Sequence, residues 1–336
     1  MNIYHRVIRQ FSNIVVKLII IPMNQFSSKL SFSIFFNPKR ALAKLLLKVS
    51  CILSDKQFVQ LSFFYYMGYP VDLKDPTTFC EKLQWLKLYN RKPEYTQMVD
   101  KYLVKKYVAS KIGKQYIIPT LGVWDRPDDI DWNILPNKFV LKTTHGGGGN
   151  GVIICEDKEH FNKMNAVKAL KKALSIDLYK KYREWPYKNV CKRVIAEAYI
   201  GEKNDELKNH DLNDYKFFCF NGRVKFFKID FGRFIDHHAN YYLPNGDLLP
   251  FGEEICPPKF DADVVLPPNI SKMIEVAELL STSIPFLRVD LYNVNNRIFF
   301  GELTFYPAAG LGRFTPLEWE KTLGEYINLP FNLDYH

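Results

Sequence analysis

The chain has 336 residues, of which 47% are hydrophobic and 15% aromatic, and a formal net charge of +10. This composition provides for the buried core of one large domain or two ordinary ones and excludes a largely disordered protein. The six cysteines are scattered without a CxxC pair or metal-ligand spacing, so we expect a reducing cytoplasm. The basic residues do not alternate with aromatic residues along a groove, so we expect no nucleic acid partner.

Most of the excess positive charge lies at the start of the chain, where residues 1–54 contain eight Lys or Arg and no Asp or Glu. An apolar run at residues 14–21 is interrupted by Lys17 and ended by Pro22, far short of the ~20 residues that span a bilayer. No small-residue cleavage site follows, so we expect no signal peptide. Two interpretations stay open: a basic, apolar surface that rests on anionic lipid, or an ordinary helical subdomain whose lysines face water.

Apolar residues at helical spacing dominate the first third of the chain. Thr78 and Glu81 have the spacing of a capping box and predict a helix that begins after Thr78. The other helices predicted here span residues 41–53, 55–67 and 95–112. We therefore expect residues 1–95 to form a basic helical N-terminal region.

Residues 138–155, KFVLKTTHGGGGNGVIIC, predict a strand, a glycine loop and a second strand. Glycines let successive backbone amides turn toward an anion, and Lys142 adds a point charge suited to phosphate. A Walker loop or a dinucleotide fingerprint opens into a helix, whereas this loop opens into another strand. The pattern therefore favours a flexible, glycine-tipped hairpin over phosphates.

The remainder of the chain alternates short strands with a few helices. The turn Asn221-Gly222 between residues 215–220 and 224–229 predicts a β-hairpin. The other predicted strands span residues 117–119, 121–124, 194–200, 286–292 and 298–303, and the other predicted helices span 159–174, 270–280 and 317–327. The fold class that follows is α+β.

Two of these strands each carry one carboxylate between apolar residues, Asp290 and Glu302. A loop with an odd number of residues, centred on Asn296, would place them directly opposite each other, ~5 Å apart at Cβ. Oxygen ligands at this separation suit Mg²⁺, whereas an even loop would put them on opposite faces. Thr304 shares the face of Glu302. Arg288 shares the face of Asp290 and either steadies a transferred phosphoryl group or forms a salt bridge with Glu302.

Five segments, in order, resemble those of ATP-grasp enzymes: DK, then VLK-GGGG-NG-VII, EAYI, DYKFFCFNG and RVD…FGELT. More narrowly, residues 75–330 resemble the TupA-like ATP-grasp family. The segments most particular to that family are PTTFCEKLQWLKLYNRKPEYTQMVDKY and FGELTFYPAAG. The resemblance implies an ATP-grasp fold over residues 96–336, with a glycine-flap subdomain at about 117–200 and a metal-binding subdomain at about 201–336. Superfamily members usually begin with a Rossmann-like domain, and residues 1–95 depart from that pattern.

Carried over by position, the resemblance implies nucleotide contacts for two lysines, four flap glycines and four hinge residues. These are Lys101, Lys142, Gly146, Gly147, Gly148, Gly149, Glu197, Ala198, Tyr199 and Ile200. Asp214 and Lys216 stand where amino-acid ligases of the superfamily often have Asp-x-Arg, and they are implied at the cofactor as well.

The resemblance also implies roles in the chemistry. Arg233 and Asn240 fall in the region that reaches the phosphates and the acyl substrate. The implied catalytic residues are Lys142, Arg233 and Arg288. The implied metal ligands are Asp290, Glu302 and Thr304, the last in place of the usual asparagine, and a hydroxyl is a poorer ligand than an amide carbonyl.

The activity that the resemblance implies is an ATP-dependent carboxylate–amine ligase with ATP and Mg²⁺ as cofactors. A carboxylate attacks the γ-phosphate of ATP, and an amine opens the acylphosphate to an amide. The expected partners are a surface polysaccharide that contains uronic acid, its precursor or an acidic peptide, and an amino acid or amine. We expect a cytoplasmic protein, peripheral on the inner membrane face if residues 1–54 bind lipid. Two alternatives stay open: a glycosyltransferase of capsule or O-antigen biosynthesis, and an ATP-grasp kinase or binding module.

Overall fold

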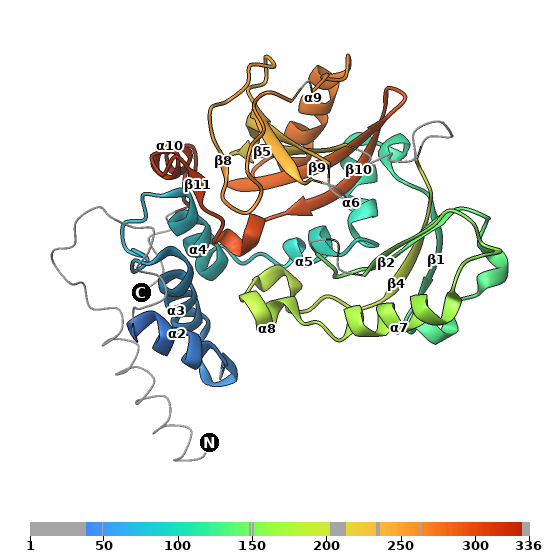
Figure 1. Cartoon of the computed structure of the whole chain (residues 1–336), viewed down its shortest axis with the longest axis horizontal. Helices are drawn as coiled ribbons and strands as arrows, with labels where there is room; N and C mark the ends of the chain where they lie inside the picture. The colour runs from blue at the N-terminus through green and yellow to red at the C-terminus, as the bar shows by residue number, and fades with distance from the viewer. Residues whose placement is uncertain are drawn as a thin grey trace.

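The computed structural model describes residues 38–48, 50–147, 149, 151–201, 213–232, 236–262 and 264–330. Figure 1 shows two sheet-containing lobes, with helices from the start of the chain at one end. The helices at this end are α2 (Pro38–Lys48), α3 (Asp55–Met67) and α4 (Phe79–Tyr89), with the 3-10 turn η2 (Ser50–Ile52). α5 (Glu94–Val99), α6 (Val104–Ile112) and the 3-10 turn η3 (Lys114–Tyr116) follow between the two lobes. No helix in these ranges is both long enough and apolar enough to cross a membrane.

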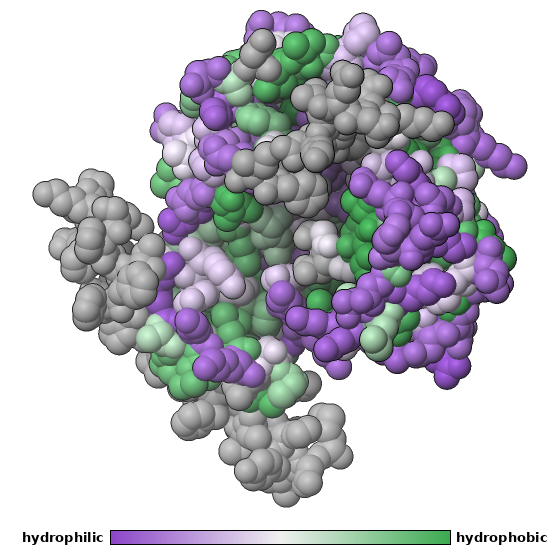
Figure 2. All heavy atoms as spheres, turned by 45° about the vertical axis from the view of Figure 1, so that its right-hand side comes forward, coloured by the Kyte–Doolittle hydropathy of each residue, from purple (hydrophilic) through white to green (hydrophobic). Residues whose placement is uncertain are grey.

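The smaller sheet has the strand order β1-β4-β2-β3, and every neighbouring pair is antiparallel. Its strands are β1 (Thr120–Trp124), β2 (Phe139–Thr143), β3 (Val152–Cys155) and β4 (Val194–Ala198), with η4 (Pro127–Asp129) and η5 (Trp132–Ile134) after β1. α7 (Lys163–Leu174) packs Ala166 and Leu170 against Phe139 and Leu141. α8 (Leu178–Tyr182) and η6 (Trp185–Tyr187) lead from α7 to β4. Figure 2 brings this lobe forward and shows its surface as mainly hydrophilic.

The larger sheet has the strand order β10-β9-β5-β6-β7. Its strands are β5 (Asp214–Phe220), β6 (Arg223–Phe231), β7 (His238–Tyr242), β9 (Phe286–Val294) and β10 (Arg297–Thr304). Every residue of β5 is buried. On one face Cys219 reaches the carbonyl of Ala277 in α9 (Ile270–Ser281), and on the other Phe220 packs with Phe79 of α4. The apolar residues of β5 thus pack into the core, whereas the first residues of the strand include the buried charged side chains of Asp214 and Lys216.

The core of the larger sheet extends into the first helices. Phe63, Phe79 and Tyr95 belong to one apolar cluster with residues of β5 and β9. α4 packs against η7 (Pro307–Gly310) and α10 (Trp319–Glu325), next to a two-stranded sheet of β8 (Gly252–Glu253) and β11 (Phe314–Thr315). The core thus crosses residue 95, and the division of the chain there remains a prediction.

Local signals in the sequence predict several elements correctly. α3 has the predicted bounds, and Thr78 and Glu81 form a reciprocal capping box at the start of α4. Asn221 and Gly222, with φ of 51° and 80°, close the predicted hairpin of β5 and β6. Other bounds differ: α2 begins and ends before the predicted 41–53, and α7 begins at Lys163 because Asn162 caps it.

The single helix predicted over residues 95–112 is wrong, because the chain breaks between α5 and α6. The fully buried side chain of Asp100 accepts hydrogen bonds from the backbone N–H groups of Tyr102 (2.8 Å) and Leu103 (3.0 Å). Aspartate competes with the helical backbone in this way, which favours a break or a cap over a helix interior. The freed N–H of Lys101 donates to the carbonyl of Thr144, 2.8 Å away, just beyond β2. The break therefore fixes Lys101 beside the smaller sheet.

Candidate active site

Glu197 in β4 gathers two lysines. Its carboxylate lies 2.7 Å from Nζ of Lys142 in β2 and 2.5 Å from Nζ of Lys105 in α6. Although burial raises the pKa of Glu197, Lys142 and Lys105 lower it below the usual range. Because two ammonium groups share one carboxylate, this group retains a positive charge that suits an anionic ligand. The sequence singled out Lys142 but missed Lys105, whose only sequence signal is its spacing of four from Lys101.

A small apolar cluster lies at the end of β4. Ala198 and Ile200 pack there against Ile118 and against Phe299 of the larger sheet. The cluster joins the two sheets next to Glu197, which is where the resemblance places the adenine-binding hinge. Tyr199 instead donates its hydroxyl to Glu156 Oε1 at 3.1 Å.

The glycine loop joins β2 to β3, as the sequence predicts. The N–H of Gly146 donates to the last carbonyl of β2 at 3.2 Å, and Gly147 is partly buried. Gly149 and Gly151 both have φ of 77°, a left-handed conformation that favours glycine. Gly148 lies outside the described residues.

Asp290 and Glu302 lie directly opposite each other, but not for the predicted reason. The turn between β9 and β10 holds two residues, Asn295 and Asn296 with φ of 51° and 60°, and so has even length. By itself this register would pair Asp290 with Gly301. A β-bulge between Phe300 and Glu302 adds one residue and turns Glu302 to the face of Asp290. The odd loop predicted from the sequence is wrong, and the bulge produces the same juxtaposition.

The three predicted metal ligands converge on one cationic nitrogen. Nη2 of Arg288 lies 2.7 Å from Asp290, 3.2 Å from Glu302 and 3.1 Å from the hydroxyl of Thr304. Nε of the same guanidinium adds a second bond to Asp290 at 2.7 Å. Carboxylate and hydroxyl oxygens that surround a positive atom also suit a hard divalent cation. These residues therefore fit Mg²⁺, and Arg288, which forms the salt bridge to Glu302, would have to move aside for it.

Lys101 completes this group from the other side. Its Nζ lies 2.9 Å from Glu302 Oε2, and although burial lowers its pKa, Glu302 raises it. Although burial raises the pKa of Glu302, Lys101 and Arg288 hold it well below the usual range. For Asp290 burial prevails over Arg288 and raises its pKa. The two facing carboxylates are thus pushed in opposite directions, as is common where carboxylates share a site.

A row of charged side chains crosses four strands of the larger sheet. Glu302 in β10 faces Asp290 in β9, which faces Lys216 in β5, which faces Lys228 in β6. Lys216 forms ion pairs with Asp214, at short range, with Asp230 at 3.0 Å and with Asp290 at 3.8 Å. Asp214 and Lys216 therefore lie next to the paired carboxylates.

Other sequence candidates contribute less. Arg233 lies outside the described residues. Asn240 exchanges two hydrogen bonds with the backbone of Lys259 at 2.7 and 2.9 Å and so holds a loop.

Asp230, His237 and Cys256 bring one metal-type donor atom each within 4.8 Å of one another. Lys216 and Lys228, 3.0 and 3.3 Å from Asp230, repel a cation there.

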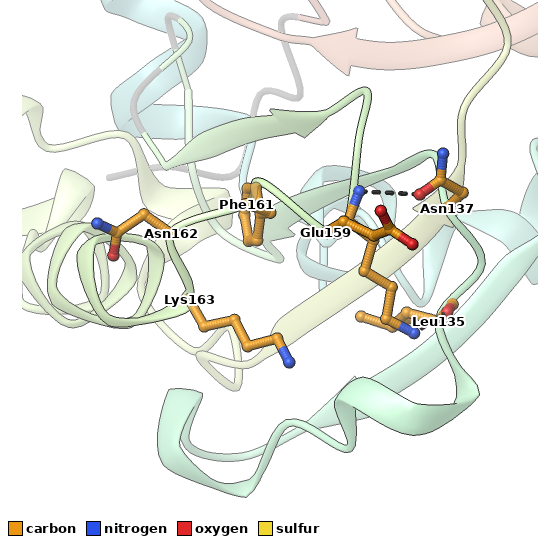
Figure 3. Close-up of a pocket in the computed structure, with 7 residues that line it drawn as sticks. Leu135, Asn137, Glu159, Phe161, Asn162 and Lys163 are labelled. Carbon is orange, nitrogen blue, oxygen red and sulfur yellow. Dashed lines mark hydrogen bonds between the residues drawn. The ribbon is translucent and has the colours of Figure 1, made fainter.

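A surface hollow of about 750 Å³ lies in the smaller lobe, between the end of η5 and the start of α7. Figure 3 shows Asn137, Glu159, Phe161 and Lys163 around it. None of the residues that line it belongs to the groups around Glu197 or Asp290.

The fold and the site define the class of this protein. Two antiparallel sheets, joined by a small apolar cluster, carry Lys142 on the smaller sheet and paired carboxylates on the larger, with Lys101 and Lys105 beside them around the start of α6. The profile of the family described as TupA-like ATPgrasp matches residues 81–328. The chain therefore belongs to the TupA-like ATP-grasp family, within a superfamily of ligases that form carbon–nitrogen bonds.

Solved structures show a remote likeness to the chain. D-alanine–D-alanine ligase from Bacillus anthracis is 14% identical, with a TM-score of 0.38, over 68% of this chain and 67% of that one. The corresponding ligase from Helicobacter pylori is 14% identical, with a TM-score of 0.40, over 76% and 68%. L-amino acid ligase from Bacillus licheniformis is 12% identical, with a TM-score of 0.40, over 69% and 50%. No curated protein matches the chain, so the assignment rests on the family match.

Proposed function

We propose that this protein is an ATP-dependent carboxylate–amine ligase that works through an acylphosphate. The observation that carries the proposal is the convergence of Asp290, Glu302 and Thr304 on one cationic nitrogen, with Lys101 on the second oxygen of Glu302. The oxygen atoms of Asp290, Glu302 and Thr304 would hold a divalent cation on the larger sheet. Mg²⁺ bound there would neutralise the charge that develops on the transferred phosphoryl group.

The chain's own residues would divide the remaining work. Lys142 and Lys105 would hold anionic nucleotide oxygens beside Glu197, and the apolar cluster of Ala198 and Ile200 would receive the adenine ring. Lys101 and Arg288 place positive charge where the carboxylate substrate meets the γ-phosphate, which lowers the repulsion between two anions. The glycine loop closes over the phosphates and excludes water from the acylphosphate.

The first experiment measures thermal stabilisation by ATP, UDP-sugars and Mg²⁺ in wild type and in Lys142→Ala. A metal-dependent stabilisation by ATP that Lys142→Ala loses supports the proposal. Release of phosphate and ADP with a carboxylate and an amine then separates a ligase from a kinase, which would transfer the phosphoryl group to a stable product. Stabilisation by a UDP-sugar without a response to ATP would refute the ligase and favour the glycosyltransferase.

We infer further that the carboxylate substrate is a uronic acid in a surface polysaccharide or its precursor, and that residues 1–54 hold the enzyme at an anionic membrane. α2 supports the second part: it exposes Leu42 (41%) and Leu45 (59%) next to Lys44 and Lys48. A helix with exposed leucines and lysines suits the surface of an anionic bilayer. Cosedimentation with vesicles that contain phosphatidylglycerol, and none with pure phosphatidylcholine vesicles, is expected. Binding to neither kind of vesicle, or equal binding to both, would contradict the proposed membrane association and leave the proposed ligase activity untouched.

A further inference from the structure

The carboxylate of Asp55 in α3 lies against three polar side chains from two directions. Nη2 of Arg91, which follows α4, lies 2.8 Å from its Oδ2. The hydroxyl of Tyr179 in α8 donates to it at 2.9 Å, and Nε of Arg183 lies 3.3 Å from its Oδ1. Figure 1 shows α8 at the end of the smaller lobe that lies nearest to α2 and α3. Asp55 therefore ties the smaller lobe to the N-terminal helices.

Arg183 adds two contacts between the same parts of the molecule. Its Nη2 donates to the carbonyl of Ser50 at 2.6 Å, and its guanidinium lies 4.8 Å from the centre of the Phe58 ring. Phe58 belongs to the apolar cluster that packs α2 against α3. Arg183 is only 6% exposed and ends α8 in a left-handed conformation, with φ of 56°. Because this side chain is enclosed by groups of the N-terminal helices, the end of α8 is fixed against them.

The other end of the same segment holds the start of the glycine loop. The carbonyl of Ile176, just before α8, accepts hydrogen bonds from Nε2 of His145 at 3.0 Å and from Nζ of Lys192 at 2.8 Å. His145 is 2% exposed and directly precedes the four glycines. A Cβ on Gly147 would lie 3.7 Å from Cδ1 of Leu178, which is an ordinary van der Waals distance. The loop therefore rests on α8 where it leaves β2.

α8 is short and closed at both ends, so it can transmit a displacement. The side chain of Asp177 caps it by accepting the N–H of Lys180 at 2.9 Å. The N–H of Arg183 donates to the carbonyl of Tyr179 at 2.7 Å and closes the last turn. The helix itself spans five residues, so its contacts with α3 and with the loop belong to one rigid unit.

A glycine loop loses much conformational freedom when it closes on a ligand. A Cβ on Gly149 would meet no described atom within 4 Å, so the protein gives this part of the loop little support. Contacts that hold a loop in its bound geometry raise affinity, because they reduce the entropy lost on binding. The contacts of His145 and Gly147 with α8 lie where such support is most effective, directly beyond β2 and Lys142.

Resting on the proposed function, we propose that Asp55 is a positioning residue for nucleotide binding. Through Tyr179 and Arg183 it fixes α8, and α8 holds the start of the glycine loop in the geometry that binds phosphate. The N-terminal helices thereby raise the affinity for the nucleotide without contact with it. Loss of the link loosens the loop and leaves the two sheets intact.

Tyr179→Phe is the first test, because it keeps the ring and removes only the hydroxyl that donates to Asp55. With the full chain, Mg²⁺ and a non-hydrolysable ATP analogue, we expect about three- to tenfold weaker nucleotide binding. Arg91→Ala is the matched control, because it removes a partner of the same carboxylate on the side of α4. It should lower stability in urea and leave nucleotide affinity unchanged. Wild-type affinity in Tyr179→Phe, or an equal loss in Arg91→Ala, overturns the proposal.

Leu178→Ala tests the other end of the link, because it removes the contact with Gly147 and keeps the contacts of Asp55. It should weaken nucleotide binding, and adding Tyr179→Phe should weaken it little further, since the two changes interrupt one link. In the ligand-free protein, the backbone amides of residues 144–147 should exchange hydrogen faster in both variants than in wild type and Arg91→Ala. Additive losses of affinity, or unchanged exchange, overturn the proposal. A wild type that fails to bind the nucleotide with Mg²⁺ refutes the proposed function instead, which keeps the two failures distinct.

Discussion

Gly301→Ala tests whether the bulge in β10 creates the metal-binding geometry. A Cβ on Gly301 would lie 2.9 Å from the carbonyl oxygen of Asp290 and 3.2 Å from Cε2 of Tyr292. The first contact is shorter than real Cβ contacts allow, and it is with backbone in the middle of a sheet. The strand must therefore move by a few tenths of an ångström, and the bulge must open or flatten.

Two consequences of Gly301→Ala differ in size. Overpacking of this kind costs about 1–3 kcal/mol of unfolding free energy. Because a misplacement of about 1 Å in a reacting site costs roughly 100-fold in rate, we expect a smaller shift to weaken Mg²⁺-dependent nucleotide binding by about tenfold. Urea denaturation measures the first quantity, and titration with Mg²⁺ at a fixed ATP concentration measures the second.

Ile298→Val separates these two effects. Ile298 is buried in β10 before the bulge, and its truncation costs about 0.5–1.5 kcal/mol without a change of register. It should lower stability and leave Mg²⁺-dependent nucleotide binding unchanged. If Gly301→Ala loses stability but binds Mg²⁺ and ATP as Ile298→Val does, the bulge does not align the carboxylates and the reasoning is refuted.

Three further predictions follow from the contacts. Lys105→Ala leaves Glu197 with one of its two ammonium partners, so it should reduce stabilisation by ATP and cost about 1–3 kcal/mol, as measured by thermal and urea unfolding. Asp55→Ala removes the hydrogen-bond acceptor of Arg91 and of the Tyr179 hydroxyl and the ion-pair partner of Arg183, so it should cost about 1–3 kcal/mol in urea, whereas Lys56→Ala on the exposed side should be neutral. Lys228 and Lys216 lower the pKa of Asp230 against the effect of burial, so its ionised form stabilises the folded state above the unfolded pKa of about 3.9, and this stability is lost as the pH falls. In Asp230→Asn the free energy of unfolding should therefore decline less steeply between about pH 5 and 3. An unchanged slope would contradict this prediction.

The sequence predicts those parts of the fold that local interactions determine. The capping box of Thr78 and Glu81 and the Asn221-Gly222 turn each act within a few residues, so they can be read without knowledge of the packing. The glycine loop is recognisable for the same reason. Lys105 could not be assigned, because its partner Glu197 is distant in the sequence and only the packing of α6 beside β4 brings the two together.

Two of the incorrect predictions, the unbroken helix over 95–112 and the odd loop at Asn296, have a common physical cause. In both places the chain departs from a regular element, since Asp100 interrupts a helical pattern and Gly301 interrupts a ladder of strand pairs. Periodicity identifies regular elements and has no signal for an inserted or interrupted residue.

These departures lie where the candidate site requires them. The break at Asp100 places Lys101 beside the smaller sheet, and the bulge at Gly301 turns Glu302 toward Asp290. The two displaced side chains then meet, with Lys101 Nζ 2.9 Å from Glu302 Oε2. An unbroken helix or a regular hairpin would each remove one partner from this contact. Functional sites often bring charged groups together through irregular backbone, at some cost in stability. The sequence-based predictions therefore fail at the two positions on which the proposed chemistry depends.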